Sequence, residues 1–187
     1  EAIYSSRNRV KAMALVHENL YRSSSIGKTS MREYVMMLAK NIYSAYGVSF
    51  ERVKFNCSTG GVEFGLDTII PLGLIMNEAI SNSLKHGFPG ESGGEINLSI
   101  ACLNCRQDMT DGAKSTLPEY QEYRLRVSDT GVGLPENFDP DKTNSLGMTL
   151  ITSLAAQLDG EITITNKVGT EIQLTFREAK YKPRDSA

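Results

Sequence analysis

The 187-residue chain predicts a two-layer α/β sandwich of the α+β class, with helices on one face of a mixed, mostly antiparallel sheet and one additional N-terminal helix. Three observations predict this fold class. Short segments with strand-like alternation follow one another as hairpin pairs, and longer segments with helical periodicity separate those pairs. The regular strand–helix alternation of a doubly wound parallel sheet is missing.

The N-terminal part predicts two helices. Apolar residues recur at heptad-like intervals over residues 2–23, which suits a helix that packs against a partner helix. This apolar seam consists of Ile3, Val10, Met13 and Leu20, with His17 on the same side. After a serine-rich break, Ser30 and Glu33 stand in capping-box positions for a second helix. That helix is expected to run to about Tyr46 and to end at Gly47.

The remaining chain predicts five strands and two further helices. The alternating segments lie at residues 53–57, 95–103, 123–128, 161–166 and 170–177. We expect Asp67 to cap a long helix with Pro71 in its first turn, and the turn at residues 87–90 to stop it. The other helix is expected over residues 146–158. The polar connection at residues 104–122 is expected to be mobile.

Composition argues against several classes of protein. A net charge of −2 and a pI of about 5.8 argue against a nucleic-acid-binding surface. We expect no membrane span, because no apolar run reaches roughly 18 residues, and no signal peptide. The P-loop signature is missing. The chain begins at Glu1 within a helical pattern, so we expect it to be a piece of a longer protein.

The three cysteines suit a reducing compartment better than a secreted disulfide framework. Cys102 and Cys105 form a C-x-x-C pair on a predicted strand, where positions three apart lie too far apart to bridge without distortion. A zinc site would need two further ligands, and no second pair exists. We therefore expect ordinary thiols.

One stripe of the long helix carries polar residues of three chemical kinds. Its members are Glu78, Asn82, Lys85 and His86, at spacings i, i+4, i+7 and i+8. The opposite side is apolar and is expected to pack into the core through Leu72, Ile75, Met76, Ala79, Ile80 and Leu84. A carboxylate, an amide and two basic groups along one edge indicate a site for a metal and phosphates.

Each member of the stripe also has a simpler interpretation. The amide oxygen of Asn82 can bind Mg²⁺ without adding charge, or it can make a local hydrogen bond. Glu78 can orient or deprotonate an attacking group, or it can form a salt bridge to Lys85 or to another exposed base. Lys85 can neutralise phosphate charge or remain solvated. His86 can line the phosphates or bind the last carbonyls of the helix.

Three later segments complete the prediction of an adenine-nucleotide site. Asp129 follows a strand and can accept a hydrogen bond from the exocyclic amine of adenine, while Gly131 and Gly133 leave room for a flat ring. Ser145, Leu146 and Gly147 open a helix, whose free N–H groups can cradle phosphates. The hydroxyl of Thr170 can reach adenine through a water. Each motif alone also suits a plain turn or a capped helix.

The order of these motifs resembles the ATP-binding Bergerat fold of sensor histidine kinases, DNA gyrase, the Hsp90 chaperone and mismatch-repair ATPases. Asn77–His86 resembles its asparagine box, Asp129–Gly133 and Asn144–Met148 resemble its two glycine boxes, and Gly169-Thr170 matches its closing pair. The resemblance covers residues 30–178. It is strongest to the short-lid histidine kinases that neighbour the HWE kinases, although the W-x-E signature of that family is absent.

This resemblance implies a function. The chain would bind ATP and Mg²⁺ and transfer the γ-phosphoryl group to a histidine on an upstream helix that lies outside this chain. A response-regulator receiver domain would then accept the phosphoryl group. Asn82 would hold Mg²⁺, Asp129 would bind adenine, Gly131 and Gly133 would wall the ring, and residues 145–147 would face the phosphates. Glu78 would assist phosphoryl transfer.

The resemblance also implies an organisation. Residues 1–25 would be part of the dimerisation and phosphoacceptor region, residues 30–178 the catalytic domain, and residues 179–187 a flexible tail. His17 does not match the acceptor motif and is expected to pack or to hydrogen bond. The full-length protein would be a homodimer that acts on the cytoplasmic side.

Three other functions stay open at this point. They are an ATPase of the gyrase and Hsp90 type, a serine kinase that acts on an anti-sigma-factor antagonist, and a scaffold that has lost catalysis. The signal sensed, the cognate regulator and the membrane anchorage of the intact protein do not follow from the sequence.

Overall fold

The computed structural model describes residues 29–104, 121–135, 138 and 146–178. Its helical elements are α2 (Met31–Tyr46), α3 (Leu66–Asn82), the π-helical turn η1 (Ser83–Gly87) and α4 (Leu146–Gln157). Its strands are β1 (Thr29–Ser30), β2 (Val53–Ser58), β3 (Glu63–Phe64), β4 (Gly94–Cys102), β5 (Glu122–Asp129), β6 (Glu161–Asn166) and β7 (Thr170–Arg177).

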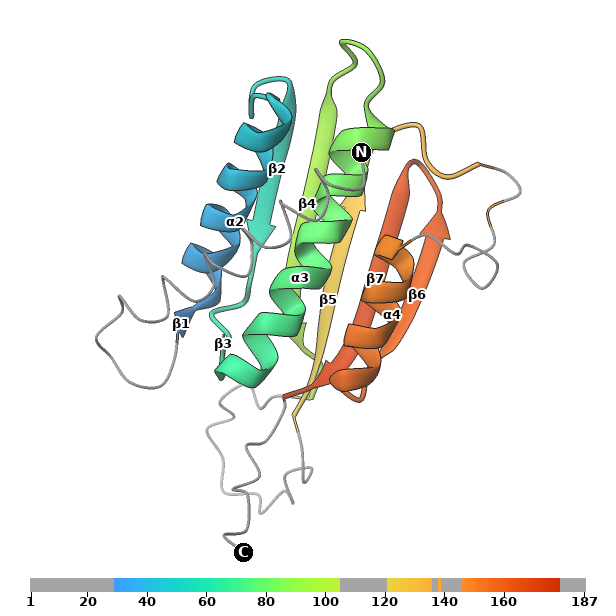
Figure 1. Cartoon of the computed structure of the whole chain (residues 1–187). Coiled ribbons are helices and arrows are strands. Elements are labelled where there is room, and N and C mark those ends of the chain that lie inside the picture. Colours follow the sequence, from blue (N-terminus) through green and yellow to red (C-terminus); the bar gives the residue numbers. More distant parts are fainter. Residues whose placement is uncertain (1–28, 105–120, 136–137, 139–145, 179–187) are drawn as a thin grey trace, which may run out of the picture.

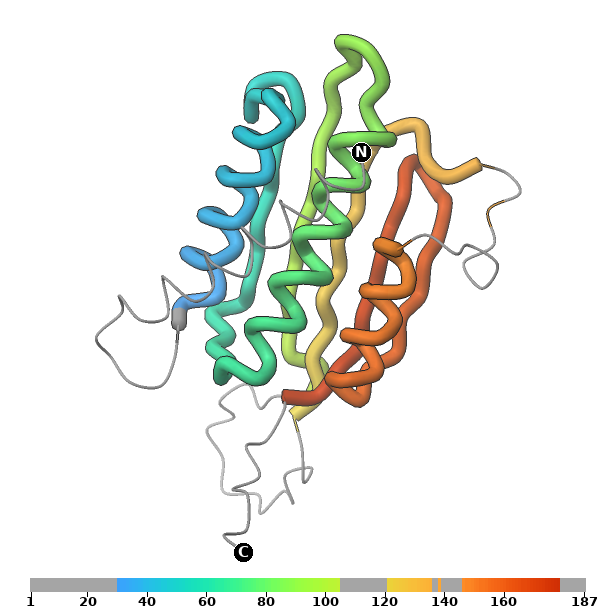
Figure 2. The backbone as a smooth tube through the Cα atoms, viewed as in Figure 1, coloured from blue at the N-terminus to red at the C-terminus, as the bar shows by residue number. Residues whose placement is uncertain are grey.

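Five strands form one sheet in the order β2-β4-β5-β7-β6. Only β2 and β4 pair in parallel, because the chain between them crosses over through α3, whereas every other neighbouring pair in this sheet is antiparallel. The helices α2, α3 and α4 lie side by side on one face of the sheet (Figure 1), and the course of the backbone through these two layers is traced in Figure 2. The predicted two-layer sandwich is confirmed.

The core forms between the sheet and the central helix α3. All residues from Pro71 to Ser81 are buried, since α2 and α4 flank this helix and the sheet lies behind it. The predicted apolar side is confirmed as core, with each member at most 6% exposed: Leu72, Ile75, Met76, Ala79, Ile80 and Leu84. The sheet contributes inward-facing side chains such as Ile96, Leu125 and Leu174.

A glycine allows α2 and α3 to lie close together. The buried ring of Tyr34 on α2 lies directly over Gly73 of α3, and a Cβ atom at Gly73 would overlap with the tyrosine hydroxyl. The Tyr34 hydroxyl is itself buried and has no hydrogen-bond partner in the described structure. Burial raises the pKa of Tyr34 far above its usual value.

Several local predictions need correction. Ser30 makes no capping hydrogen bond with its side chain, so the predicted capping box does not form. The long helix begins at Leu66 with Gly65 at its N-cap, so Asp67 lies inside the first turn and Pro71 lies beyond it. Its α-helical part ends at Asn82, and a π-turn continues to Gly87.

Two further differences concern pairing. The two-residue strands β1 and β3 form a small antiparallel sheet that the sequence did not predict, because each is too short for an alternation pattern. Cys102 is disulfide-bonded, so the expectation that it is an ordinary thiol is wrong, whereas Cys57 is free. Burial raises the pKa of the Cys57 thiol.

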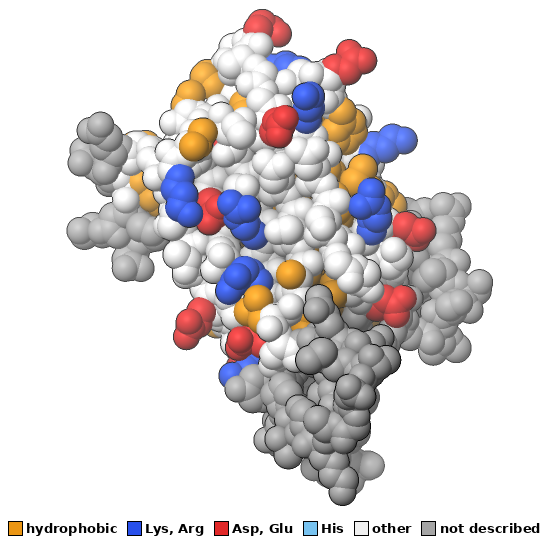
Figure 3. Space-filling view, turned by 180° about the vertical axis from the view of Figure 1, so that it is seen from behind, with side chains coloured by type: hydrophobic (Ala, Val, Ile, Leu, Met, Phe, Trp, Pro, Cys, Tyr) orange, Lys and Arg blue, Asp and Glu red, His pale blue; other side chains and the backbone are white. Residues whose placement is uncertain are grey.

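The face of the sheet away from the helices is polar. Figure 3 views the molecule from behind and shows Lys, Arg, Asp and Glu side chains distributed over this face. Arg126 on β5 pairs with Glu171 on β7, and Lys167 approaches the same carboxylate to 3.7 Å. The hydrogen bond from Arg126 lowers the pKa of Glu171. Charged side chains on neighbouring strands thus pair across this face.

Some predictions fall outside the described residues. These are the helix over residues 2–23 with His17, most of the connection over 104–122, and the charged tail. Within the described ranges, none of the helices has the length and apolar character that crossing a membrane requires.

The contact between Gly73 and Tyr34 can be tested by stability measurements. Gly73→Ala should lower the free energy of unfolding by about 1–3 kcal/mol, because the added methyl group displaces a packed ring. Tyr34→Phe should leave stability unchanged or raise it by about 1 kcal/mol, because its hydroxyl is buried without a partner. The double variant Gly73→Ala/Tyr34→Phe should recover part of the unfolding free energy that Gly73→Ala loses. Urea unfolding measures all three.

Gly65→Ala is the matched control, since nothing lies within 4 Å of a Cβ atom at Gly65. A stable Gly73→Ala variant would contradict the close contact. A Tyr34→Phe loss above about 1 kcal/mol would mean that the hydroxyl has a partner.

Candidate functional site

A buried carboxylate lies at the end of the central strand β5. Asp129 is 6% exposed and accepts three hydrogen bonds. The backbone N–H groups of Gly131 and Thr170 donate to Oδ1 at 2.9 and 3.1 Å, and the hydroxyl of Ser83 donates to Oδ2 at 2.7 Å. These donors come from η1, from the loop after β5 and from the start of β7. The carboxylate therefore joins three segments that are distant in sequence.

Glycines pack these segments tightly around the carboxylate. A Cβ atom at Gly131 would overlap with the carbonyl group of Gly87, and one at Gly169 would overlap with the backbone of Asp129. The N–H group of Val132 donates to the carbonyl oxygen of Gly87 at 2.9 Å. Glycine at position 131 is thus required by the close approach of the Gly87 backbone.

The C-terminal end of α3 carries the predicted metal and catalytic residues to the same end of the sheet (Figure 1). Glu78 is 5% exposed, and the amide of Asn77 donates to its Oε1 at 3.5 Å. Asn82 is the last residue of α3 and is half-buried. Lys85 and His86 lie in η1 and are exposed. The predicted stripe therefore divides into a buried part and a solvent-facing part.

The remaining predicted residues come from the loops around Asp129 and from α4. Gly133 has φ of 75°, a left-handed conformation that favours glycine. Thr170 is the first residue of β7 and is half-buried. Leu146 and Gly147 are the first two residues of α4, with Leu146 63% exposed. Ser145 lies outside the described residues.

Sequence reasoning missed three contributors to this site. Ser83 follows Asn82 directly, but helical spacing does not predict its contact with Asp129, because that residue lies 46 positions later in the chain. The carbonyl of Gly87 was interpreted only as part of a stop signal. Asn166 on β6 holds the loop after β5, since its side chain bonds both N–H and C=O of Leu134, at 3.1 and 2.8 Å.

The donor set fits a magnesium ion held largely by phosphates. Within the described ranges, no group of three or more His, Cys, Asp or Glu side chains could hold a metal ion by itself. A neutral amide oxygen such as that of Asn82 suits Mg²⁺, which keeps several waters and is usually bound through few protein ligands and substrate phosphates.

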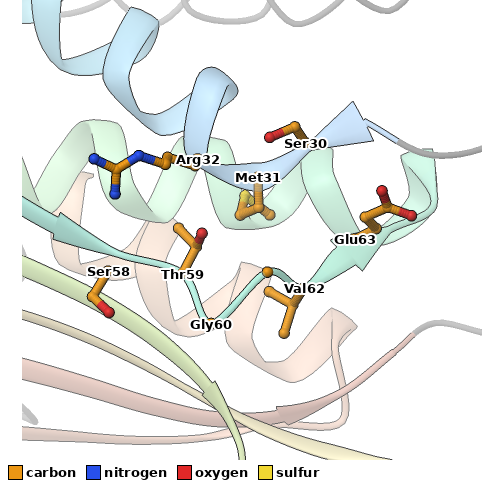
Figure 4. Close-up of a pocket in the computed structure, with 9 residues that line it drawn as sticks. Ser30, Met31, Arg32, Ser58, Thr59, Gly60, Val62 and Glu63 are labelled. Carbon is orange, nitrogen blue, oxygen red and sulfur yellow. The ribbon is translucent and has the colours of Figure 1, made fainter.

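A separate hollow lies at the opposite end of the sheet. It has a volume of about 310 Å³ and lies between the start of α2 and the segment from β2 to β3 (Figure 4). Arg32 at its rim donates to the carbonyl oxygen of Cys57 at 3.0 Å. None of the residues predicted for the nucleotide lines it.

Two family models match the chain. The model described as histidine kinase-, DNA gyrase B- and HSP90-like ATPase matches residues 67–180. A second model, described as histidine kinase, matches residues 1–46. The first match contains Asn82, Asp129 and Thr170, and it covers the chain from the first turn of α3 through β7.

Curated relatives include two histidine kinases and a serine kinase. The chain is 23% identical to blue-light-activated histidine kinase 2 of Erythrobacter litoralis over 93% of this chain and 47% of that protein. It is 24% identical to sensor histidine kinase PdtaS of Mycobacterium tuberculosis, over 93% of this chain and 32% of that protein. It is 26% identical to serine-protein kinase RsbW of Listeria monocytogenes, over 57% of this chain and 67% of that protein. The chain thus spans less than half of the two histidine kinases.

Solved structures share the fold. The histidine kinase domain of the Erythrobacter litoralis blue-light activated histidine kinase superposes with a TM-score of 0.71 at 22% identity, over 92% of this chain and 74% of that one. Mycobacterial sensor histidine kinase MprB superposes with a TM-score of 0.55 at 14% identity, over 81% of this chain and 97% of that one. At these identities the likeness establishes the fold.

Close packing at Gly131 can be tested in the isolated protein. Gly131→Ala should lower the free energy of unfolding by about 2 kcal/mol, because the methyl group cannot fit against the Gly87 carbonyl. It should also speed hydrogen exchange at the Val132 amide, whose hydrogen bond would break. Val132→Ala is the control. Val132 is 68% exposed, so truncation of its side chain should change the free energy of unfolding by about 0.5 kcal/mol at most. Equal stability of the two variants would contradict the packing.

Proposed function

Because the chain belongs to the family of histidine kinase-, DNA gyrase B- and HSP90-like ATPases, we propose that it is the ATP-binding catalytic domain of a sensor histidine kinase. Its site would transfer the γ-phosphoryl group of Mg-ATP to a histidine on an upstream helix. The observation that carries this proposal is the buried, three-fold hydrogen-bonded carboxylate of Asp129 at the same end of the sheet as Asn82. The histidine kinase match at residues 1–46 supports the choice of a histidine as acceptor.

Asp129 would recognise the adenine base. An ionised carboxylate only accepts hydrogen bonds, so it pairs with the exocyclic amine of adenine and repels the carbonyl oxygen at the same position of guanine. Its three protein donors fix the plane of the carboxylate before the base arrives. Such preorganisation reduces the ordering cost of binding.

Asn82 would hold Mg²⁺ together with the phosphates. When bound, the ion would neutralise charge on the β- and γ-phosphates. The N-terminal end of α4, at Leu146 and Gly147, would face the phosphates, with the exposed Lys85 and His86 at the phosphate end of the site. Each of these residues carries a group that is chemically suited to an anion or a hard cation.

Glu78 would act on the acceptor histidine. It is buried one helical turn before Asn82, and the spacing of four residues places both on the same side of α3. A carboxylate there would accept a hydrogen bond from the imidazole and orient its attacking nitrogen. Positioning and charge neutralisation would supply most of the catalysis, as phosphoryl transfer generally requires.

The proposal includes an organisation and partners. Residues 1–25 would belong to the dimerisation and phosphoacceptor region, residues 30–178 would form the catalytic domain, and residues 179–187 a tail. The full-length protein would dimerise and would pass the phosphoryl group to a receiver domain. Because ATP is the donor, the reaction would take place on the cytoplasmic side.

A serine kinase is the second candidate, because the chain is similar to serine-protein kinase RsbW over 57% of its length. Incubation of the full-length protein with radiolabelled ATP and Mg²⁺ separates the candidates. Acid-labile and base-stable label on the protein would support a histidine kinase. Acid-stable label on a partner would support a serine kinase, and release of phosphate without labelled protein would support an ATPase.

The role of Asn82 predicts a metal-dependent loss. Asn82→Ala should weaken ATP binding by about tenfold or more when Mg²⁺ is present, which corresponds to about 1.4 kcal/mol. In EDTA the variant and the wild type should bind ATP equally. Isothermal titration calorimetry measures both conditions, and Asn41→Ala, at an exposed asparagine on α2, is the control. An Mg²⁺ effect of the same size in Asn82→Ala would rule out this residue as a ligand.

The role of Asp129 predicts a change of base preference. Asp129→Asn should reduce the preference for ATP over GTP by about tenfold to a hundredfold, because an amide can donate to the oxygen of guanine. Competition binding with both nucleotides measures the ratio. Asp159→Asn is the control, at an exposed left-handed position that asparagine tolerates. If Asp129→Asn keeps the wild-type ratio of ATP to GTP affinity, the carboxylate does not distinguish the two bases.

A further inference from the structure

Ser83 connects the end of α3 with the carboxylate of Asp129. It is 8% exposed, and its hydroxyl donates to Oδ2 of Asp129 at 2.7 Å. The preceding residue is Asn82, the proposed ligand of Mg²⁺. A single backbone step thus separates the group that would hold the metal from the group that binds the base-recognising carboxylate.

Ser83 stands where α3 meets the π-turn η1. Its backbone N–H donates to the carbonyl oxygens of Ala79 and Ile80, so the end of α3 sets its position, and the π-turn continues from it to Gly87. The two ends of the turn contact the end of β5 and the segment that follows it. Ser83 at the start donates to Asp129, and the Gly87 carbonyl at the end accepts from Val132. Such turns occur frequently at functional sites.

The hydrogen bonds around Asp129 determine what its oxygens can still accept. A carboxylate offers about four lone-pair positions. Two backbone donors, Gly131 and Thr170, use Oδ1, and Ser83 uses one position of Oδ2. One position of Oδ2 is then left for a ligand. Because the Ser83 hydroxyl has given its only hydrogen to Asp129, its oxygen can only accept from a ligand or a water.

We propose that Ser83 is a positioning residue for base specificity, which fixes Oδ2 of Asp129 as an acceptor for an amino group at position six of a purine. This inference rests on the proposed function, since it assumes that Asp129 binds the base. With both groups limited to accepting, the edge of the site admits a 6-amino purine and rejects a 6-oxo purine. Without the serine, Oδ2 loses the donor that orients it, and the contact with the amine weakens.

Two nucleotides that differ only at the amino group test this role. ATP and purine riboside 5′-triphosphate have the same phosphates, ribose and ring system, but the second lacks the 6-amino group. Wild type should prefer ATP by about tenfold to a hundredfold, as expected for a hydrogen bond to a charged group. In Ser83→Ala this preference should fall by about fivefold to tenfold, with binding of the purine nucleotide unchanged within about twofold.

Three variants complete the experiment, with affinities from calorimetry in Mg²⁺. Ser81→Ala is the matched control, because Ser81 lies two residues earlier at the same 8% exposure and should keep the wild-type preference. Ser83→Thr keeps the hydroxyl and should restore the preference. Ser83→Cys has nearly the size of serine but donates weakly, so it should show the selective loss even if the alanine variant fails to fold.

The outcomes separate this inference from the proposed function. An unchanged preference in Ser83→Ala and Ser83→Cys would overturn the positioning role. If both nucleotides bind more weakly by the same factor, Ser83 has only a structural role, and the positioning role is overturned. If the wild type itself does not prefer ATP over the purine nucleotide, the proposed contact between Asp129 and adenine is wrong, whatever the serine variants do.

Discussion

The buried carboxylate of Asp129 is the constraint on which the candidate site depends. A carboxylate at 6% exposure needs hydrogen bonds, because burial of an unsatisfied charge is costly. Its three donors can reach it only when β5 lies beside β7 and η1 packs against the loop after β5. The absence of side chains at Gly131 and Gly169 is a second requirement, since a Cβ atom at either would overlap with backbone. The hydrogen bonds to Asp129 and the close packing at the two glycines thus require the same arrangement of β5, β7 and η1.

The layered architecture explains how α3 can be both core and site. The helix lies between α2 and α4 with the sheet behind it, so most of its length is buried and its direction is determined by packing. Its last turn emerges at the end of the sheet where β5 ends and β7 begins. There the helix changes to a π-turn, and Ser83 at the junction donates to Asp129. A rigid helix therefore carries polar groups whose placement would be poorly defined on a loop.

Strand and helix periodicity predicted most of the fold, since the hairpin β6–β7 and the end of α2 at Gly47 agree with the predicted residues. The sequence could not predict β1 and β3, which are shorter than any period, or the π-turn, because helical spacing assumes a constant rise and rotation. Helical spacing also does not predict burial along the polar stripe, where Glu78 is buried while Lys85 is exposed. Ser83 was missed because the residue that accepts its hydrogen bond lies 46 positions away. The site roles themselves stay predictions.

The hydrogen bonds to Asp129 from Ser83 and Thr170 span 46 and 41 residues of sequence. Closing such long loops costs chain entropy before any contact repays it, so non-local pairings of this kind form slowly. No fragment that stops before Thr170 contains all three donors. On a growing chain, the proposed nucleotide site would therefore be incomplete until β7 had been synthesised and had joined the sheet, because shorter chains would lack the Thr170 donor to Asp129.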